Sequence, residues 1–209
     1  MLTILAAAVL GYFLGSIPAG YIAGRIAGLD IRTVGSGNIG ATNVTRTLGK
    51  RFGYPVFAFD FAKGLAAIIL SRLIANQGDA ASANLVDLCA ATAGGAAVLG
   101  HSYSIWLGLR GGKGVATSIG VLFGVAWPAA LIVCASWILV FQISRYVSLA
   151  SIVAAITLPI TTTALFLMER LKTPILIYFS FFLMLIVVLR HRSNLSRLLD
   201  RTEPRFERK

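Results

Sequence analysis

The sequence predicts an all-α integral membrane protein with about seven transmembrane helices, some of them short or re-entrant. Of its 209 residues, 57% are hydrophobic and only 13% are charged, and the mean hydropathy is +0.81. A water-soluble domain of this size could hardly cover so much apolar surface with polar groups. Long apolar windows alternate with connectors rich in glycine and cations. With no long-period repeat or linker, the chain is predicted to be one domain over residues 1–209.

Six apolar windows account for the predicted helices. They cover residues 2–23, 54–74, 83–99, 115–141, 147–168 and 175–189. The first window has no basic segment before it and contains Gly15, Pro18 and Gly20, so it is predicted to be a retained span and not a cleaved signal peptide. Small residues recur in the first and third windows, which predicts that these helices pack closely.

The charges of the connectors predict the orientation in the membrane. The connector over residues 25–51 contains five cations and one acid, Asp30, whereas the connector over residues 76–87 contains only the acids Asp79 and Asp87. Because cationic connectors stay in the cytoplasm, the first is expected inside and the second outside. The basic tail over residues 190–209 is expected inside as well.

The number of crossings follows from this orientation. The connector before residue 115 and the tail both lie inside, so the chain between them must cross an even number of times, yet only three windows remain. The window over residues 115–141 contains Trp127-Pro128 near its middle, where proline would end one helix and start another. Two short helices there give seven in all. A six-span protein with its tail outside is the alternative.

A loop of glycines and small polar residues, residues 35–43, precedes the second window and is followed by Arg46. Glycines let backbone N–H groups converge on an oxyanion without obstruction by a Cβ, and a nearby cation supplies the charge that a phosphate requires. Some of the Asn and Thr residues are expected to be helix caps, but so many donors together favour an anion site. The candidates are Gly35, Ser36, Gly37, Asn38, Thr42, Asn43 and Arg46.

A second glycine loop follows the third window. It superficially resembles a nucleotide P-loop, but its glycines are one residue too close, and Gly114 replaces the Ser or Thr that would hold magnesium. The loop is therefore predicted to hold a phosphate and not to hydrolyse ATP. The candidates in and before it are His101, Ser104, Gly111, Gly112, Lys113 and Gly114.

Further polar side chains lie within or at the ends of the windows. Asp60 and Lys63 are three residues apart in the second window, where unpaired charges are unfavourable, so they are predicted to pair or to face a polar site. An arginine or histidine at a helix end can equally be a headgroup anchor. We expect all five polar clusters to meet on one membrane face and form one site. The candidates at the last two helix ends are Arg145, Ser148, His191 and Asn194.

The net charge of +11 has a membrane explanation. Cations crowd the tail and flank the first loop, which fits an anionic cytoplasmic leaflet. Nucleic acid is disfavoured as a partner, because no basic patch outside an apolar window is interleaved with aromatics. No spacing of carboxylates, histidines or the cysteines Cys89 and Cys134 predicts a metal site or a cofactor, and nothing predicts an obligatory protein partner.

The motifs together resemble those of the bacterial acyl-phosphate-dependent glycerol-3-phosphate acyltransferases. The resemblance rests on Gly-Ser-Gly-Asn-x-Gly-Ala-Thr-Asn-x-x-Arg at 35–46, Phe-Asp-x-x-Lys-Gly at 59–64, and Gly-His-x-x-Ser with Gly-Gly-Lys-Gly-Val-Ala-Thr at 100–117. It extends to Arg-Tyr-x-Ser-Leu-Ala-Ser at 145–151 and to Arg-His-Arg-x-Asn-Leu-x-Arg-Leu-Leu at 190–199. It therefore covers nearly the whole chain.

This resemblance implies a seven-helix enzyme of the bacterial inner membrane with its active site on the cytoplasmic face. Such an enzyme moves a fatty acyl group from acyl phosphate to the sn-1 hydroxyl of glycerol 3-phosphate, giving lysophosphatidic acid and inorganic phosphate in phospholipid biosynthesis. An acyl phosphate is already activated, so the enzyme has to position the alcohol, neutralise phosphate charge and assist removal of one proton. No covalent intermediate is required.

Roles for the candidates follow as hypotheses. The groups expected to bind and polarise the acyl phosphate are Ser36, Arg46, Lys113 and Ser148. Lys63, Asn194 and the first-loop amides are expected to help position glycerol 3-phosphate. His191, or less favourably His101, would orient the hydroxyl. Alternatively, a phosphate oxygen of the substrate takes the proton.

Three other functions are less favoured by the sequence. Well-known glycerolipid acyltransferases carry Asp after His and four intervening residues, but here Trp106 and Ser196 occupy those positions. No Gly-x-Ser-x-Gly elbow for a serine acyl-enzyme exists. A small organophosphate transporter would also need glycine loops and cations. Transport, however, predicts polar groups near the midplane of broken helices, whereas the polar groups of this chain gather at one end of the predicted spans.

Overall fold

The computed structural model describes residues 1–76 and 82–206, and in these residues every regular element is helical. The predicted all-α class is therefore confirmed. The chain forms two compact units, Met1–Val125 and Ala126–Lys209. Asp79, which supported the predicted orientation, lies outside the described residues, as do Arg208 and Lys209.

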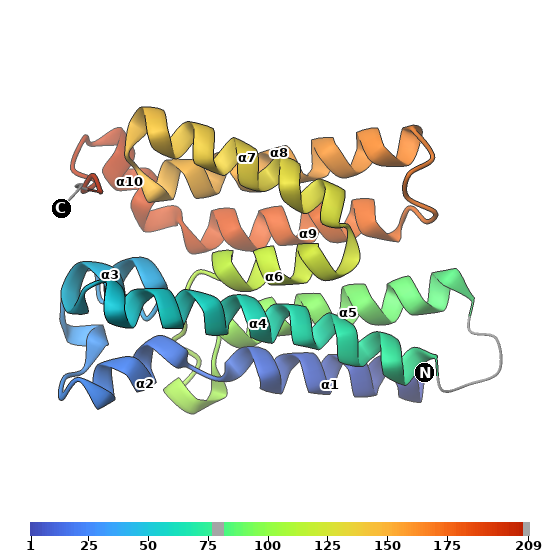
Figure 1. Ribbon diagram of the computed structural model, residues 1–209, viewed down its shortest axis with the longest axis horizontal. Coiled ribbons are helices and arrows are strands. Elements are labelled where there is room, and N and C mark those ends of the chain that lie inside the picture. Colours follow the sequence, from blue (N-terminus) through green and yellow to red (C-terminus); the bar gives the residue numbers. More distant parts are fainter. Residues whose placement is uncertain (77–81, 207–209) are drawn as a thin grey trace. The chain divides into compact units, whose positions relative to one another are not determined.

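The first unit consists of long helices that pack side by side and short helices at one end (Figure 1). Its α-helices are α1 (Leu2–Ser16), α2 (Ala19–Ile26), α3 (Ala41–Leu48), α4 (Lys50–Ala75), α5 (Ala83–Ser102) and α6 (Val115–Val125). Two short 3₁₀ helices, η1 (Ile31–Thr33) and η2 (Ile105–Leu107), lie in the connectors. Helices α1, α5 and α6 all contact α4, which is the longest helix of the unit.

Small residues allow α1 and α5 to pack backbone against backbone. A Cβ added at Gly11 would overlap the carbonyl of Ala93, and one at Gly15 would overlap the carbonyl of Ala97. Gly120 of α6 lies equally close to the carbonyl of Phe61 in α4. Close approach of this kind stabilises helix pairs where lipid removes the hydrophobic drive for association, so the predicted close packing is confirmed.

The first predicted window is not one continuous helix. It breaks between Ser16 and Ala19, because Pro18 has no N–H for the ladder and forces Ile17 out of the helical region (ψ 116°). The break exposes the carbonyl of Ile17 to other partners. That carbonyl contributes to the site described below.

The second unit contains three long apolar helices and one short polar helix. They are α7 (Trp127–Ser144), α8 (Val147–Leu167), α9 (Ile175–Arg190) and α10 (Arg192–Leu199). Helix α8 packs against both α7 and α9, and α10 continues α9 after a bend of 60° at His191. The predicted break near Trp127-Pro128 is confirmed, since α6 ends at Val125, Ala126 is non-helical and Pro128 lies in the first turn of α7.

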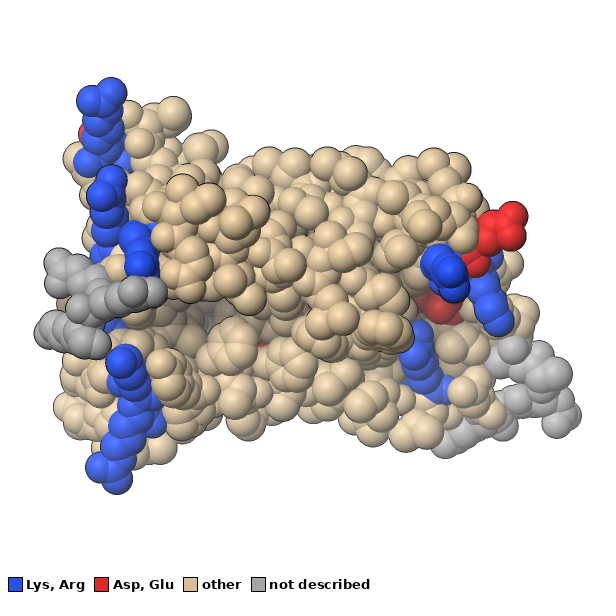
Figure 2. Space-filling view, turned by 45° about the horizontal axis from the view of Figure 1, so that its top comes forward, with Lys and Arg blue, Asp and Glu red and all other residues tan. Residues whose placement is uncertain are grey.

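Within residues 1–76 and 82–206, length and apolar composition mark four helical stretches as able to cross a membrane, and five if the bent pair α9 and α10 counts as one span. Helix α4, with 26 residues, is also long enough, at about 39 Å. On the face drawn in Figure 2, Lys and Arg gather toward the helix ends and the broad middle is almost free of charge. The predicted multi-pass membrane protein is confirmed, while seven crossings stay a prediction.

Candidate functional site

The buried side chain of Asn43 holds the backbone of the first glycine loop through hydrogen bonds. Its Oδ1 accepts a hydrogen bond from the backbone N–H of Ser36 (2.8 Å). Its Nδ2 lies 3.3, 3.1 and 2.8 Å from the carbonyl oxygens of Ile31, Val34 and Asn38. Because the amide is committed to the loop backbone, Asn43 supports the loop rather than facing a ligand. The loop takes this shape because Gly35 and Gly37 have positive φ angles of 59° and 68°.

The other candidates of this loop differ in accessibility. Ser36 and Arg46 are exposed, and Thr42 is half-buried in the first turn of α3. Asn38 caps the loop locally, since its Oδ1 accepts from the N–H of Gly40 (2.8 Å). Thus Ser36 and Arg46 remain accessible to a substrate, whereas Asn38 and Asn43 hold the backbone that presents them.

An ion pair lies beside this loop in η1. Asp30 accepts three hydrogen bonds from the side chain of Arg32, at 2.9, 3.2 and 2.6 Å, and one from its backbone N–H. The side-chain hydrogen bond from Arg32 is the main reason that the pKa of Asp30 falls to about 2. Arg32 also stacks on the ring of Tyr21. The charge of Arg32 is therefore already compensated by Asp30.

The second loop is hydrogen-bonded to the end of α5. The N–H of Gly112 donates to the carbonyl of His101 (2.9 Å), and that of Gly111 to the carbonyl of Ser102 (3.1 Å). Gly112 is buried against the imidazole, because a Cβ there would overlap Nε2 of His101. Lys113 is half-buried, and helix α6 begins two residues later. Ser104 is buried and donates to the carbonyl of Ser16 (2.6 Å), so its role is to attach the connector to α1.

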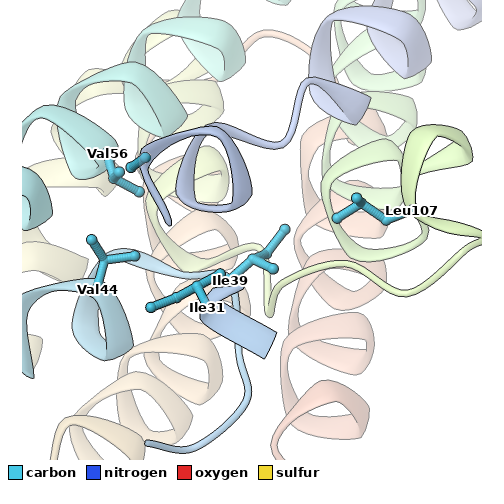
Figure 3. Packing of buried hydrophobic residues seen from close by; sticks show 6 residues of the cluster. Ile31, Ile39, Val44, Val56 and Leu107 are labelled. Carbon is cyan, nitrogen blue, oxygen red and sulfur yellow. The ribbon is translucent and has the colours of Figure 1, made fainter. Parts of the chain in front are cut away.

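The two glycine loops lie at the same end of the first unit. Ile39 of the first loop and Leu107 of η2 belong to one buried cluster with Ile31, Val44 and Val56 (Figure 3). Gly20 in α2 makes this approach feasible, since a Cβ there would overlap the carbonyl of Ile39. The hydrophobic cluster therefore fixes the two polar loops on a common support.

The intramembrane charges pair as predicted. Nζ of Lys63 lies 2.7 Å from Oδ1 of Asp60, and the two side chains are only 3% and 2% exposed. Lys63 also donates to the carbonyl of Ile17 (2.9 Å) at the break between α1 and α2. Nδ1 of His101 lies 3.4 Å from the same Asp60 oxygen. Lys63 and His101 are thus buried in a network beneath the second loop.

In the second unit, the candidates Ser148 and Asn194 converge on a residue that sequence reasoning missed, Glu203. Ser148 Oγ and Asn194 Nδ2 both donate to Oε1 of Glu203, each at 2.7 Å. Arg197 Nε donates to Oε2 at 2.8 Å. Ser148 lies in the first turn of α8 and Asn194 in α10, so the carboxylate joins two helices to the tail.

Burial alone would raise the pKa of Glu203, but the hydrogen bonds from Ser148, Asn194 and Arg197 outweigh it and hold that pKa below the ordinary value of 4.5. The carboxylate is therefore ionised at neutral pH. The three donors, a hydroxyl, an amide and a guanidinium, are groups of the kind that also bind phosphate oxygens, and here they hold the Glu203 carboxylate.

His191 is buried at the bend between α9 and α10. Its Nδ1 lies 2.8 Å from the carbonyl of Val187. Because a carbonyl only accepts, Nδ1 carries the hydrogen, and Nε2 of the neutral ring is the acceptor. The backbone thus sets the tautomer that a general base requires.

Arg145 forms the sharp turn between α7 and α8. It adopts a left-handed conformation (φ 63°) at the end of α7, which is uncommon outside glycine. Its carbonyl accepts from the N–H of Phe206 (2.9 Å), and Arg205 donates to the hydroxyl of Tyr146 (3.1 Å). The tail is therefore attached to this turn, which carries Ser148 three residues later.

The comparisons with known proteins agree with this picture. The family model for glycerol-3-phosphate acyltransferase matches residues 5–201. The chain belongs to the glycerol-3-phosphate acyltransferase family. The predicted family and enzyme class are thereby confirmed, and the alternative of a transporter is set aside.

Relatives in this family match nearly the full length. A glycerol-3-phosphate acyltransferase of Brucella anthropi is 43% identical over 206 residues, covering 98% of this chain and 94% of the relative. One of Gloeobacter violaceus is 46% identical and covers 93% and 91%. Among solved structures, the integral membrane acyltransferase PlsY in its glycerol 3-phosphate form is 40% identical, with a TM-score of 0.82 and coverage of 98% and 96%. Its lysophosphatidic acid form gives a TM-score of 0.80 at 39% identity.

The sequence offered no signal for Glu203 in this acyltransferase, and only a partial one for the carbonyl of Ile17. Glu203 is 55 positions from Ser148 and lies in a tail dominated by cations. No periodicity relates the two. The Ile17 carbonyl was foreseeable in part, because Pro18 leaves the preceding carbonyls without intrahelical donors.

Proposed function

We propose that this protein transfers a fatty acyl group from acyl phosphate to the sn-1 hydroxyl of glycerol 3-phosphate, releasing inorganic phosphate and lysophosphatidic acid. The full-length family match carries the acyltransferase assignment. A relative crystallised in glycerol 3-phosphate and lysophosphatidic acid forms supports the acceptor and the product. The two glycine loops with Arg46 and Lys113 support a phosphorylated donor.

In this proposal the chain acts as one acyltransferase domain, in agreement with the single match over residues 5–201. The protein lies in the bacterial inner membrane and uses its cytoplasmic face. The groups proposed to contact substrate phosphates are donors that the sequence predicted. They are Ser36, Arg46, Thr42, Lys113, the amides of the two glycine loops, Arg145, Ser148 and Asn194.

The chemistry needs one proton acceptor. Nε2 of His191 is the acceptor in the tautomer fixed by Val187, so we assign it the hydroxyl proton of glycerol 3-phosphate. The hydroxyl oxygen then attacks the acyl carbon, and the bond from that carbon to the phosphate oxygen breaks. The leaving group is inorganic phosphate, whose charge Lys113 and Arg46 offset. His101 is less suited, because its Nε2 is packed against Gly112.

The test incubates purified protein with glycerol 3-phosphate and, in separate reactions, acyl phosphate, acyl-CoA and an acyl carrier protein thioester. We expect lysophosphatidic acid from acyl phosphate, with one phosphate released per lipid formed. Product from the thioesters alone would overturn the donor assignment and leave the family assignment intact. A Lys113→Ala variant, expected to lose most activity with acyl phosphate, controls for contaminating acyltransferases.

A further inference from the structure

We propose that Asp60, Lys63 and His101 form a positioning network that holds the Gly111–Lys113 loop in its phosphate-binding shape without touching substrate. The inference rests on the proposed function, in which this loop binds a phosphate of a substrate. It changes the role of Lys63 and His101 from direct ligands to supporting groups.

The network lies where several helices of the first unit begin or end. Helix α1 ends at Ser16, α5 ends at Ser102 and α6 begins at Val115, whereas α4 passes this level uninterrupted (Figure 1). Helix ends leave backbone groups without intrahelical partners. Asp60 and Lys63 lie on the α4 segment that faces these ends, so α4 supplies the charges that the ends lack.

Lys63 connects α4 to the end of α1. Its ammonium is shared between the Asp60 carboxylate (2.7 Å) and the carbonyl of Ile17 (2.9 Å). The next residue, Gly64, lets the first turn of α6 approach, because a Cβ there would overlap the carbonyl of Thr117. One short segment of α4 therefore fixes the ends of two other helices.

His101 connects Asp60 to the loop. One side of its ring, Nδ1, lies 3.4 Å from Asp60 Oδ1, and the other side, Nε2, packs against Gly112. Its carbonyl also accepts the N–H of Gly112 (2.9 Å). A shift of the ring or of Asp60 would consequently move the loop amides. The position of α4 therefore affects the position of the loop, because His101 contacts the loop through both its ring and its backbone carbonyl.

Packing alone does not account for these residues. The three side chains are 4% exposed or less, and charged groups so deep in a membrane protein are unfavourable unless they serve a polar function. In the described part of the chain, Ser102, Thr117 and Ser118 next to the loop also have buried hydroxyls without a hydrogen-bond partner. The interior beneath the loop is therefore polar, whereas the middle of the surface drawn in Figure 2 is almost free of charged residues. Lys63 is occupied by Asp60 and the carbonyl of Ile17, and the His101 ring lies between Asp60 and Gly112, so we assign neither side chain a contact with substrate.

The experiment measures KM for each substrate and kcat in purified variants. Gly112→Ala serves as the reference for a displaced loop, since its methyl group must push the His101 ring. We expect Asp60→Asn to raise KM for the same substrate as Gly112→Ala does, by about tenfold or more, with a smaller change in KM for the other substrate. Ile105→Ala, which shortens an exposed side chain in the same connector, should leave both KM values unchanged.

A second comparison tests the ring contact. His101→Ala removes the group that the Gly112→Ala methyl group meets, so the double variant should bind its substrate no worse than His101→Ala alone. If the increases in KM caused by the two single changes added up in the double variant, the two residues would not act through the same contact, and the proposal would be contradicted.

Folding is followed in parallel by thermal melting. Should Asp60→Asn not accumulate because Lys63 is left buried and unpaired, the neutral pair Asp60→Asn with Lys63→Gln is measured by the same criteria. Wild-type KM values for both substrates in a folded variant, or a rise for the opposite substrate, would overturn the network. Failure of the wild-type protein to use acyl phosphate would instead overturn the proposed function.

Discussion

At the residue scale, polar side chains of similar type have different roles in this acyltransferase. Asn43 and Asn38 hydrogen-bond the loop that carries them, whereas Ser36 and Arg46 extend to the surface. The density of glycine, Asn and Thr predicted a loop here, which the structure contains, while its binding of an anion stays a prediction. It did not separate supporting residues from ligands, since that depends on which side of the loop a side chain lies.

Asn43→Asp tests the supporting role. The change keeps an oxygen for the Ser36 N–H but replaces a donor that faces three carbonyls with a second acceptor. We expect loss of more than about 3 kcal/mol of stability, because buried carbonyls lose their donor and face a negative charge. The measurement is the melting temperature in detergent. Asn38→Ala, which removes one hydrogen bond to Gly40, should cost about 1 kcal/mol, and equal effects of the two changes would contradict the assignment.

His191→Ala tests the proton acceptor. If Nε2 takes the hydroxyl proton, kcat should fall by about a hundredfold or more with a smaller effect on KM. Ser193→Ala, two residues further on and exposed, is the control. Wild-type turnover of His191→Ala across the pH range would rule out a catalytic role and leave the substrate phosphate as the proton acceptor.

At the element scale, helix ends determine where the chemistry is placed. Proline predicted the break between α6 and α7 correctly, but the break at Pro18 was absorbed into one apolar window, because apolar composition continues through it. The connection from the tail to α8 and α10 through Glu203 was not predictable, since it depends on the fold of residues 55 positions apart. Hydropathy predicts where apolar helices lie in the sequence, but it does not predict the contacts between their ends.

Glu203→Gln tests this connection and its pH dependence. The native carboxylate has a lowered pKa, so its contribution to stability is complete above about pH 4.5, the ordinary value, and is lost as the pH falls through the native pKa. We expect the variant to lose about 2 kcal/mol at pH 7. Its melting temperature should also fall less than that of the wild type between pH 7 and pH 3.5. Parallel pH curves for the two proteins would show that folding does not lower the pKa of Glu203.

At the scale of the whole molecule, orientation was predicted from charge and remains to be measured. The hydrophobic cluster that Ile39 and Leu107 share brings the connectors of the two glycine loops together in the first unit, which agrees with both loops being cytoplasmic. Composition and length alone mark four or five spans. The sequence yields seven only because the positive-inside rule is applied to the connectors and the tail.

Cysteine accessibility decides between seven and six crossings. In a background with Cys89 and Cys134 replaced by alanine, single cysteines at Ser36, Asp87 and Ser193 are labelled in intact cells and in inverted vesicles with a reagent that does not cross membranes. With seven crossings, positions 36 and 193 react only in inverted vesicles and position 87 only in cells, because an odd number of helices separates the last from the other two. Reaction of position 193 from outside would establish the six-span arrangement, and it would place Ser148 or His191 on the wrong side for a cytoplasmic substrate. A fourth single cysteine, at Lys113, is labelled in the same way. Labelling of positions 36 and 113 on opposite faces would contradict the shared support of the two loops and the proposed mechanism with it.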